Sequence, residues 1–230
     1  MINLSVIVPF FNEEIYLEES VNRVLNAAQF SQILLVDNGS TDSSLSIAKD
    51  IESKNKNVFV IQSSFQKGKG HALKQAFKLV SNDHFIVHDA DLEYFPEDIL
   101  EMYELSKVNN QSMILGSRFI GHRERDNKYL STYLANRLIS LYFSFLNFYS
   151  VTDVATCYKL MPKDFLIKTN FLEDGFAIEV EILSKFLKYN KSIIEHPIRY
   201  IGRTYDEGKK IKLSDGFVYL YKIIYYRFLG

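Results

Sequence analysis

The sequence predicts an α/β fold with a mostly parallel sheet flanked by helices. Four apolar, β-branched segments of strand length alternate with segments in which apolar residues recur at helical spacing. Strand and helix alternating in this way is typical of a parallel sheet covered by helices on both faces. A chain of 230 residues, 47% of them hydrophobic, is long enough to form one domain with a large core.

The elements of the first half follow in a regular order. We expect strands at 4–10, 33–37, 57–62 and 84–91, and helices starting near Leu17, over about 42–54, over 69–80 and from Pro96. Asn12 is a plausible N-cap of the first helix, because a short polar side chain can accept from its free N–H groups. Ser40 or Thr41 lies near the cap of the second helix.

The second half is less regular and unusually aromatic. We expect strands at 112–119, near 154–161 and near 192–201, and helices over about 129–149, near 176–189 and at the C-terminus. The segments 129–149 and 217–229 combine Tyr and Phe with basic residues, a composition typical of helices at a membrane surface. The alternative is that both helices pack on the sheet as core. The longest uncharged run, 138–152, and the tail 217–229 are both shorter than the roughly 20 residues that span a bilayer, so no transmembrane helix is predicted.

The bulk composition excludes some classes of protein. A net charge of −1 lacks the basic excess of a dedicated nucleic-acid binder, so no nucleic-acid partner is expected. The single cysteine, Cys157, excludes an intramolecular disulfide framework and suits a reducing, cytoplasmic compartment. No signal peptide is evident at the N-terminus.

Polar residues gather where each of the first four strands ends. In sheets of this kind, ligands bind just beyond the carboxyl ends of the strands. We therefore expect one site built from four loops, which contain Asn12 and Glu13, Asp37, Lys67 to Gly70, and Asp89 to Glu93.

The segment HDADLE, residues 88–93, is the strongest candidate for a metal site. Residues i and i+2 of a strand point to the same side, so Asp89 and Asp91 can converge on one ion. Two or three carboxylates with open positions suit Mg²⁺ or Mn²⁺, which then bridges the phosphates of a substrate. Glu93 is a candidate third ligand. The alternative is a polar strand end in which Asp91 caps the next helix, and His88 is interpreted as structural.

The other loops suit a nucleotide. Asn12, Glu13 and Asp37 are placed to meet a base or ribose, and Gly39 allows a tight turn. The segment QKGKGHA, residues 66–72, puts two lysines and two glycines before a helix N-terminus, an arrangement suited to phosphate. Helix capping and turn formation remain the alternative for each loop.

Together these segments resemble the family 2 glycosyltransferases, which have the GT-A fold. The matching segments, in order, are PFFNE (9–13), VDNGSTD (36–42), QKGKGHAL (66–73), HDADLEYFPED (88–98), GSR (116–118) and TCYKLMPKDF (156–165). The loop RTYDEGKKI, 203–211, is similar to a segment of the branch that contains dolichyl-phosphate mannose synthase and bacterial polyprenyl-phosphate glycosyltransferases. Two positions depart from the usual pattern: Asn38 replaces a second acid, and Glu93 stands where relatives often carry Gln or Ser.

The resemblance implies an inverting glycosyltransferase that moves a hexose from a GDP- or UDP-sugar to a polyprenyl phosphate, dolichyl or undecaprenyl. It implies Mg²⁺ or Mn²⁺ as cofactor, and a peripheral enzyme on the cytoplasmic face of a membrane, with a possible membrane-protein partner. It also implies a single domain over 1–230, with a nucleotide-sugar half at 1–120 and an acceptor half at 121–230. Two alternatives stay open: transfer to a saccharide hydroxyl in cell-envelope glycan synthesis, and a non-catalytic subunit that binds sugar nucleotides.

The resemblance also suggests roles for individual residues. The nucleotide-sugar site would comprise Pro9, Phe11, Asn12, Glu13, Asp37, Gly39, Lys69, Gly70, Asp89, Ala90, Asp91 and Arg118. The metal ligands would be Asp89, Asp91 and Glu93; the acceptor-phosphate ligands Arg203, Lys209 and Lys128; and the catalytic residues Asp91, Arg203, Glu179 and Glu181.

The nature of the acceptor decides whether a general base is needed. A lipid phosphate is already ionised at pH 7, whereas a sugar hydroxyl needs a carboxylate to take its proton. Asp153, Glu179 and Glu181 are the candidates for that carboxylate. Glu179 and Glu181 are two residues apart on an expected helix and face different ways, so we expect only one of them to point inward.

Overall fold

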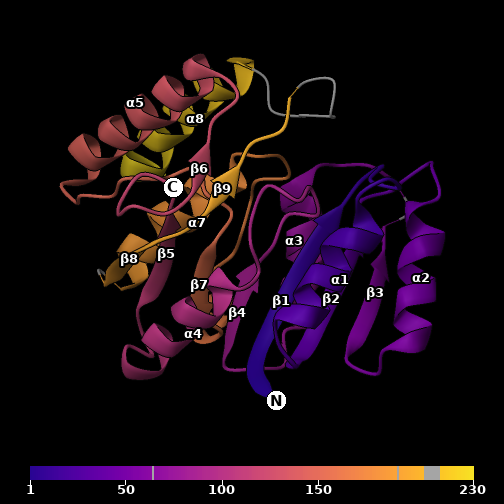
Figure 1. The fold of residues 1–230 in the computed structure, drawn as a ribbon. Helices are drawn as coiled ribbons and strands as arrows, with labels where there is room; N and C mark the ends of the chain where they lie inside the picture. Colours follow the sequence, from indigo (N-terminus) through magenta and orange to yellow (C-terminus); the bar gives the residue numbers. More distant parts are fainter. Residues whose placement is uncertain (64, 191, 205–212) are drawn as a thin grey trace.

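A seven-stranded sheet forms the centre of the protein (Figure 1). The computed structural model describes residues 1–63, 65–190, 192–204 and 213–230. The strand order is β3-β2-β1-β4-β7-β5-β8, and every neighbouring pair is parallel except the two made by β7. The predicted α/β fold class is confirmed. The strands are β1 (Ile2–Phe10), β2 (Phe30–Asp37), β3 (Val58–Gln62), β4 (His84–Val87), β5 (Met113–Ser117), β7 (Lys159–Pro162) and β8 (Ile193–Pro197).

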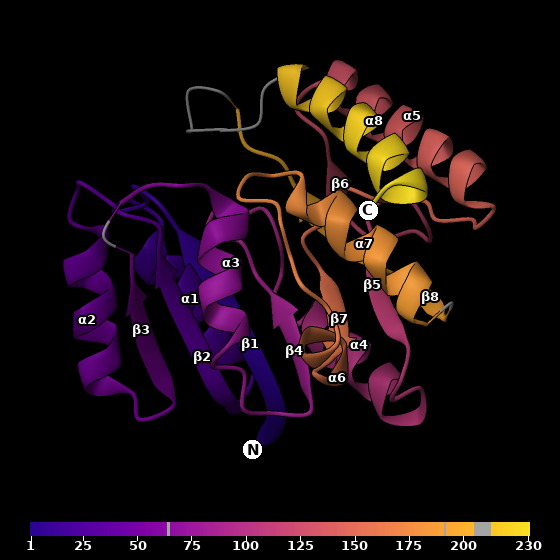
Figure 2. The ribbon, with the colours of Figure 1, turned by 180° about the vertical axis from the view of Figure 1, so that it is seen from behind.

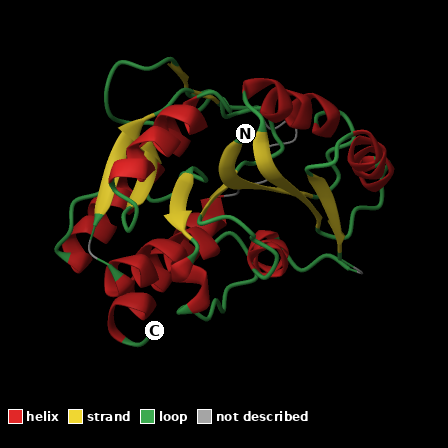
Figure 3. Cartoon of the chain, turned by 90° about the horizontal axis from the view of Figure 1, so that it is seen from below, coloured by secondary structure: helices red, strands yellow, loops and turns green. Residues whose placement is uncertain are grey.

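Helices cover both faces of this sheet. They are α1 (Leu17–Ala27), α2 (Ser44–Lys54), α3 (Lys69–Phe77), α4 (Asp98–Val108), α5 (Leu130–Asn147), α6 (Asp164–Ile167), α7 (Ile178–Tyr189) and α8 (Leu213–Phe228). Helices α1, α2 and α4 pack on one face, and α3, α6 and α7 on the other, as the two opposite views show (Figures 1 and 2). The layers are also visible end-on in Figure 3.

Strand β1 shows why this arrangement could be predicted. Val6 and Val8 belong to the core beneath α1 and α2, whereas Ile7 belongs to the core beneath α3, and all three are fully buried. Successive side chains of a strand point to opposite faces, so a strand covered on both faces has to be apolar throughout. The uninterrupted apolar run of β1 follows from this position in the sheet.

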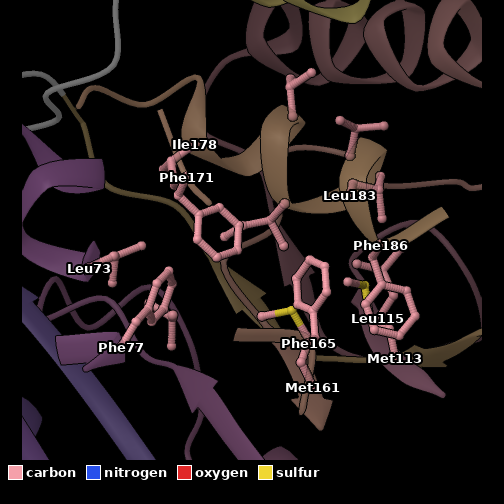
Figure 4. Packing of buried hydrophobic residues seen from close by; sticks show 14 of the residues in the cluster. Leu73, Phe77, Met113, Leu115, Met161, Phe165, Phe171, Ile178, Leu183 and Phe186 are labelled. Atoms are coloured by element: carbon pink, nitrogen blue, oxygen red, sulfur yellow. The ribbon is translucent and has the colours of Figure 1, made fainter. Parts of the chain in front are cut away.

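The larger core connects α3 to the C-terminal helices (Figure 4). The ring centroids of Phe77 and Phe171 are 5.1 Å apart, and those of Phe165 and Phe186 are 5.0 Å apart. Aromatic pairs at such distances add to the stabilisation from their buried area. This packing fixes α7 against the sheet, and the first turn of α7 is thereby held at the site described below.

Strand β4 ends four residues earlier than the sequence predicts. Its pairing with β1 stops at Val87, after which the N–H of His88 donates to the carbonyl of Ile7 at 2.8 Å. Asp89 and Asp91 therefore lie in the turn that follows the strand, and their convergence cannot come from strand alternation. The strand predicted near 154–161 likewise begins only at Lys159.

The predicted cap of the first helix is also wrong. Helix α1 begins at Leu17 with Tyr16 at the N-cap position, and Asn12 lies four residues before that, in the left-handed region at φ 49°. Short polar side chains such as Asn tolerate this conformation better than most residues. Asn12 therefore serves the loop after β1 and not the helix.

The segment predicted as a strand over 192–201 is divided. After β8 the chain turns, and β9 (Tyr200–Ile201) pairs in parallel with β6 (Arg125–Asp126) in a separate two-stranded sheet. This pairing carries the chain back toward the carboxyl ends of the central strands, where Arg203 follows. Helices α5 and α8 lie side by side, and α8 also contacts α7 (Figures 1 and 2). No helix within the described ranges is both long and apolar enough to cross a membrane.

Candidate active site

A cavity of about 430 Å³ lies beyond the carboxyl ends of β1, β2 and β4. It is bounded by loops of the first half and by residues of α5, α7 and α8 from the second half. The predicted site residues that line it are Pro9, Phe11, Glu13, Lys69, Asp89, Ala90, Asp91, Glu93, Arg118, Glu179 and Arg203. The structure thus brings together residues that are almost 200 positions apart in the chain.

Two predicted binding residues do not line the cavity: Asn12 ties the first two loops together, and Asp37 braces the second loop from within. Asn12 accepts a hydrogen bond from the N–H of Thr41 at 2.8 Å and donates its own N–H to Ser40 Oγ at 3.0 Å. Asp37, which is buried, accepts from the N–H of Ser40 at 2.9 Å. These contacts fix the shape of the loops that surround the cavity.

Two predicted glycines are required by close approaches of the backbone. Gly39 has φ +79°, and a Cβ there would lie 2.6 Å from the backbone N of Gln66. A Cβ on Gly70 would lie 2.3 Å from the carbonyl oxygen of Glu173. Each glycine therefore allows one loop of the site to pack against another.

Asn38, the departure from the usual acid, joins the second loop to the third. Its Oδ1 accepts from the N–H groups of both Lys67 and Gly68, each at 3.3 Å. The side chain also borders the cavity. The amide of Asn38 therefore helps to hold the loop that precedes Lys69 in place.

A chain of alternating charges runs through one wall of the cavity. Lys69 Nζ lies 2.7 Å from Asp89 Oδ1 and 2.8 Å from Glu179 Oε1, and Glu179 Oε2 lies 2.5 Å from Lys159 Nζ. Burial alone would lower the pKa of Lys69, but Asp89 and Glu179 raise it well above its usual value. Burial would raise the pKa of Asp89, yet Lys69 brings it below its usual value.

Arg203 forms a second set of contacts at the cavity. Its Nη1 lies 3.3 Å from Glu13 Oε2, and its Nη2 lies 3.3 Å from Asp91 Oδ2. Its backbone N–H donates to Glu93 Oε1 at 2.8 Å, and the Tyr200 hydroxyl donates to Glu93 Oε2 at 2.8 Å. The buried Nε of Arg203 has no hydrogen-bond partner among the described residues and lies 4.0 Å from Glu93 Oε1.

Asp89 and Asp91 are the carboxylates best suited to hold a divalent cation. Burial and the nearby Glu93 and Asp89 raise the pKa of Asp91 well above its usual range, a repulsion that a cation would offset. Both oxygens of Glu93 already accept protein hydrogen bonds, and no cluster of three potential ligands exists among the described residues. Mg²⁺ and Mn²⁺ are often held by one or two carboxylates together with substrate phosphates. The aspartate pair fits this mode of binding.

Arg118 and its partner Asp153 form a buried ion pair. Two guanidinium nitrogens of Arg118 lie 2.7 and 2.8 Å from the two carboxylate oxygens of Asp153. The guanidinium also lies over the ring of Tyr200 at 4.8 Å. Arg118 therefore borders the cavity with its charge already neutralised, and Asp153 is engaged as its counter-ion.

Glu181 lies away from the cavity, whereas Glu179 faces it. The carboxylate of Glu181 accepts from the N–H groups of Leu172 and Glu173 at 2.7 and 2.8 Å, and pairs with Lys185 at 2.7 Å. Residues two apart on a helix point in different directions. The structure therefore assigns the two carboxylates different surroundings, with only Glu179 at the site.

Of the two lysines predicted to bind acceptor phosphate, Lys128 lies on the surface and pairs with Asp126 at 2.5 Å. Lys209 lies outside the described residues. Two arginines that the sequence did not assign to the site, Arg125 and Arg137, lie over the ring of Phe119 at 5.7 and 5.3 Å, and neither of them lines the cavity. Arg125 belongs to β6 and Arg137 to α5, so only the fold brings them together.

The outward sides of α5 and α8 carry many exposed apolar side chains. The inner sides of the same helices are buried, with Phe143 on α5 and Ile223 on α8 fully enclosed. We call the outward side the α5–α8 face; it comprises Leu130, Leu134, Leu138, Leu141, Phe145, Phe217, Val218, Tyr221, Ile224 and Phe228. Each helix therefore packs against the core on one side and presents apolar side chains to solvent on the other. Large exposed apolar patches mark interaction sites.

The sequence matches a described family over most of its length. The family model "Glycosyl transferase family 2" matches residues 5–169. The chain is 32% identical over 210 residues to a dolichol-phosphate mannosyltransferase of Pyrococcus furiosus, covering 90% of this chain but 58% of that relative. It thus spans little more than half of that protein. It is also 26% identical over 218 residues to an undecaprenyl-phosphate mannosyltransferase of Micrococcus luteus, covering 92% of this chain and 88% of the relative.

The fold is shared with solved structures. One is glucosyl-3-phosphoglycerate synthase from Mycobacterium tuberculosis, in complex with Mn²⁺, UDP-glucose and phosphoglyceric acid. It matches with a TM-score of 0.74 and 17% identity, covering 97% of this chain and 79% of that one. At this identity the likeness shows the GT-A fold.

Proposed function

From the premise that this chain belongs to glycosyl transferase family 2, we propose that it transfers a hexose from a nucleoside-diphosphate sugar to a polyprenyl phosphate. The match to this family confirms the prediction from the sequence that the chain is a glycosyltransferase. Two relatives are named for transfer to dolichol phosphate and undecaprenyl phosphate, which supports this class of acceptor. The chain's own residues supply the further argument.

The observation that carries the proposal is the state of the carboxylates around the cavity. Each acid that lines it has a cationic or hydroxyl partner, namely Glu13, Asp89, Asp91, Glu93 and Glu179. To take the proton of a hydroxyl acceptor, one of these carboxylates would have to leave that partner. A phosphate monoester is already charged at pH 7 and needs no base. The site therefore favours an acceptor that is ionised before it binds.

We propose that the loops of 1–120 bind the donor. Lys69, the first residue of α3, brings both an ammonium and a helix N-terminus to the cavity, two features that favour phosphate. Asp89 and Asp91 would hold Mg²⁺ or Mn²⁺. Such an ion, when bound, neutralises charge that develops on a departing diphosphate.

In the proposed reaction an oxygen of the acceptor phosphate attacks the anomeric carbon of the hexose. The bond from that carbon to the diphosphate breaks, and the nucleoside diphosphate leaves with the electron pair, so the configuration inverts. Arg203 would bind the acceptor phosphate through its guanidinium, because the guanidinium fork matches phosphate oxygens.

We further propose that the α5–α8 face rests on a membrane surface and presents the lipid acceptor to the cavity. Thr132 and Asn136 of α5 and Tyr219 of α8 line the cavity, so the two helices connect the apolar face to the site. Arg227 of α8 is only partly buried, and such a cation favours anionic headgroups, whereas Lys222 is paired with Glu173 at 2.6 Å. The enzyme would then be peripheral, on the cytoplasmic face.

A partition assay tests the acceptor. The protein is incubated with Mn²⁺, a membrane lipid extract, and radiolabelled UDP-glucose or GDP-mannose, and the products are separated between organic and aqueous phases. We expect label in the organic phase that mild acid releases, as for a sugar linked to a lipid phosphate. Label that enters only water-soluble saccharides would refute the lipid acceptor and favour transfer to a hydroxyl. An Asp91→Asn variant provides the background.

A further inference from the structure

Lys159 is a buried lysine that neither the donor loops nor the acceptor residues explain. Its side chain is 1% exposed and does not border the cavity. Its Nζ lies 2.5 Å from Glu179 Oε2 and also donates to the carbonyl oxygen of Thr156. A buried charge is costly unless it is paired, so Lys159 has to be compensated, and Glu179 supplies the compensation.

Glu179 is held on both of its oxygens. Oε2 binds Lys159 behind the cavity wall, and Oε1 lies 2.8 Å from Lys69, which borders the cavity. Two ammonium groups on opposite oxygens restrict the rotation of the carboxylate. An ionised carboxylate has about four lone-pair positions, so two remain for another donor.

The position of Glu179 relative to Asp89 indicates which group of the ligand supplies that hydrogen-bond donor. Lys69 bridges the two acids, so Glu179 stands one lysine away from a carboxylate assigned to the diphosphate end of the donor. The sequence predicts that the loops after β1 and β2 hold the nucleoside, so the group on the other side of the diphosphate is the sugar. A hexose offers hydroxyl donors there, and hydrogen bonds to charged acceptors are the strong ones.

We propose that Lys159 is a positioning residue for donor recognition: together with Lys69 it holds Glu179 as a fixed, charged acceptor for a hydroxyl of the transferred hexose. This rests on the proposed function only in that the donor is a sugar nucleotide, and it does not depend on the acceptor. Lys159 itself does not touch the sugar. A purely structural role, in which Lys159 only stabilises α7 against β7, makes a different prediction.

The test is a double-mutant cycle of Lys159→Met, Glu179→Gln and the combined variant. Met retains the aliphatic stem of lysine, and the combined variant leaves a neutral pair in place of the ion pair. Calorimetry measures the Kd of UDP-glucose and GDP-mannose, with UDP and GDP as sugar-free probes, all in the presence of Mn²⁺. We expect each single variant to bind the sugar nucleotide about tenfold more weakly or worse, and the sugar-free nucleotide within about twofold of wild type.

The combined variant distinguishes the two roles. If Lys159 acts through Glu179, the combined variant binds the sugar nucleotide within about twofold of Glu179→Gln alone. Lys185→Met is the matched control, because Lys185 pairs with Glu181 on the same helix at 2.7 Å, away from the cavity. We expect it to leave donor affinity unchanged.

Four results would overturn the proposal. The combined variant could bind donor more than about fivefold more weakly than Glu179→Gln, or fail to fold, and either would show that Lys159 supports more than Glu179. Glu179→Gln could bind donor as tightly as wild type. Glu179→Gln could weaken the sugar-free nucleotide as much as the sugar nucleotide, which would exclude a contact specific to the sugar. Failure of the lipid acceptor is distinct, since it would leave donor binding intact and abolish only the organic-phase product.

Discussion

The guanidinium of Arg203 lies 3.3 Å from the carboxylate of Asp91, and the two residues are 112 positions apart in the chain. A cation of the protein thus stands beside a carboxylate that we propose as a metal ligand. The contact joins the donor loops to the segment that follows β9. It also implies a competition, because a divalent ion would compete with Arg203 for the carboxylate of Asp91. Arg203 would then keep Glu13 as a partner and turn its Nη2 toward a phosphate.

Replacing Arg203 by Met tests this competition. We expect the nucleotide-free variant to bind Mn²⁺ several-fold more tightly than wild type, because its carboxylates lose their internal cation, while transfer activity falls about 100-fold. Electron paramagnetic resonance of free Mn²⁺ measures the affinity. Arg199→Met is the matched control, since Arg199 pairs with Asp98 at 2.9 Å outside the cavity. Equal Mn²⁺ affinity in wild type and Arg203→Met would contradict the competition.

Replacing Asp91 by Asn tests the metal-centred account. Removal of one preorganised stabiliser of the transition state typically costs about 3 kcal/mol, so we expect kcat to fall about 100-fold or more. Steady-state kinetics with saturating donor measure it. Asp50→Asn is the control, because Asp50 makes only an exposed ion pair on α2. An Asp91→Asn enzyme with wild-type activity would make us abandon this mechanism.

Charged substitutions on the α5–α8 face test membrane binding. Leu138 and Leu141 are 64% and 68% exposed, so changing both to Glu should leave folding intact but abolish flotation with vesicles that contain anionic lipid. Val108→Glu is the control, because Val108 is 81% exposed at the end of α4 and lies outside this face. Flotation of the Leu138/Leu141 variant at the wild-type level would show that this face does not bind the membrane.

Replacing Asp153 by Asn tests whether Arg118 and Asp153 stabilise the fold as a buried ion pair. Asp153→Asn leaves a buried guanidinium without its counter-charge, for which we expect a loss of about 3–5 kcal/mol in the free energy of unfolding. Urea denaturation measures this loss. Lys54→Met removes an exposed surface ion pair and should leave the free energy of unfolding nearly unchanged. Similar small losses in both variants would show that Asp153 does not stabilise the fold through Arg118.

The first half of the fold could be predicted because its signals are local. The apolar run of β1 marks a strand covered on both faces, and this is visible within a short stretch of sequence. The acids after β4 could be predicted as site residues because ligands bind in the loops beyond the carboxyl ends of parallel strands. The end of β4 itself was missed because nothing in the residues 88–91 shows where pairing with β1 stops. Asp89 and Asp91 lie at the cavity all the same, positioned by a turn.

The partners of charged residues could not be predicted, because they come from distant segments. The sequence predicts Arg118 as a phosphate ligand, whereas the structure pairs it with Asp153, 35 positions away in the chain. The sequence shows Lys159 only as a lysine in an apolar strand segment. Its role depends on its pairing with Glu179, which lies on α7. The choice between Glu179 and Glu181 was likewise open, since helical geometry separates their directions without saying which one faces the site.

The central claim is transfer to an acceptor that is already ionised, and the most direct measurement compares polyprenyl phosphate with the matching polyprenol. Both lipids are incorporated into identical vesicles and incubated with the protein, Mn²⁺ and a radiolabelled sugar nucleotide, and label in the extracted lipid is counted. The account predicts labelled product from polyprenyl phosphate and none above background from polyprenol. Equal transfer to the two lipids, or transfer to polyprenol alone, would contradict it.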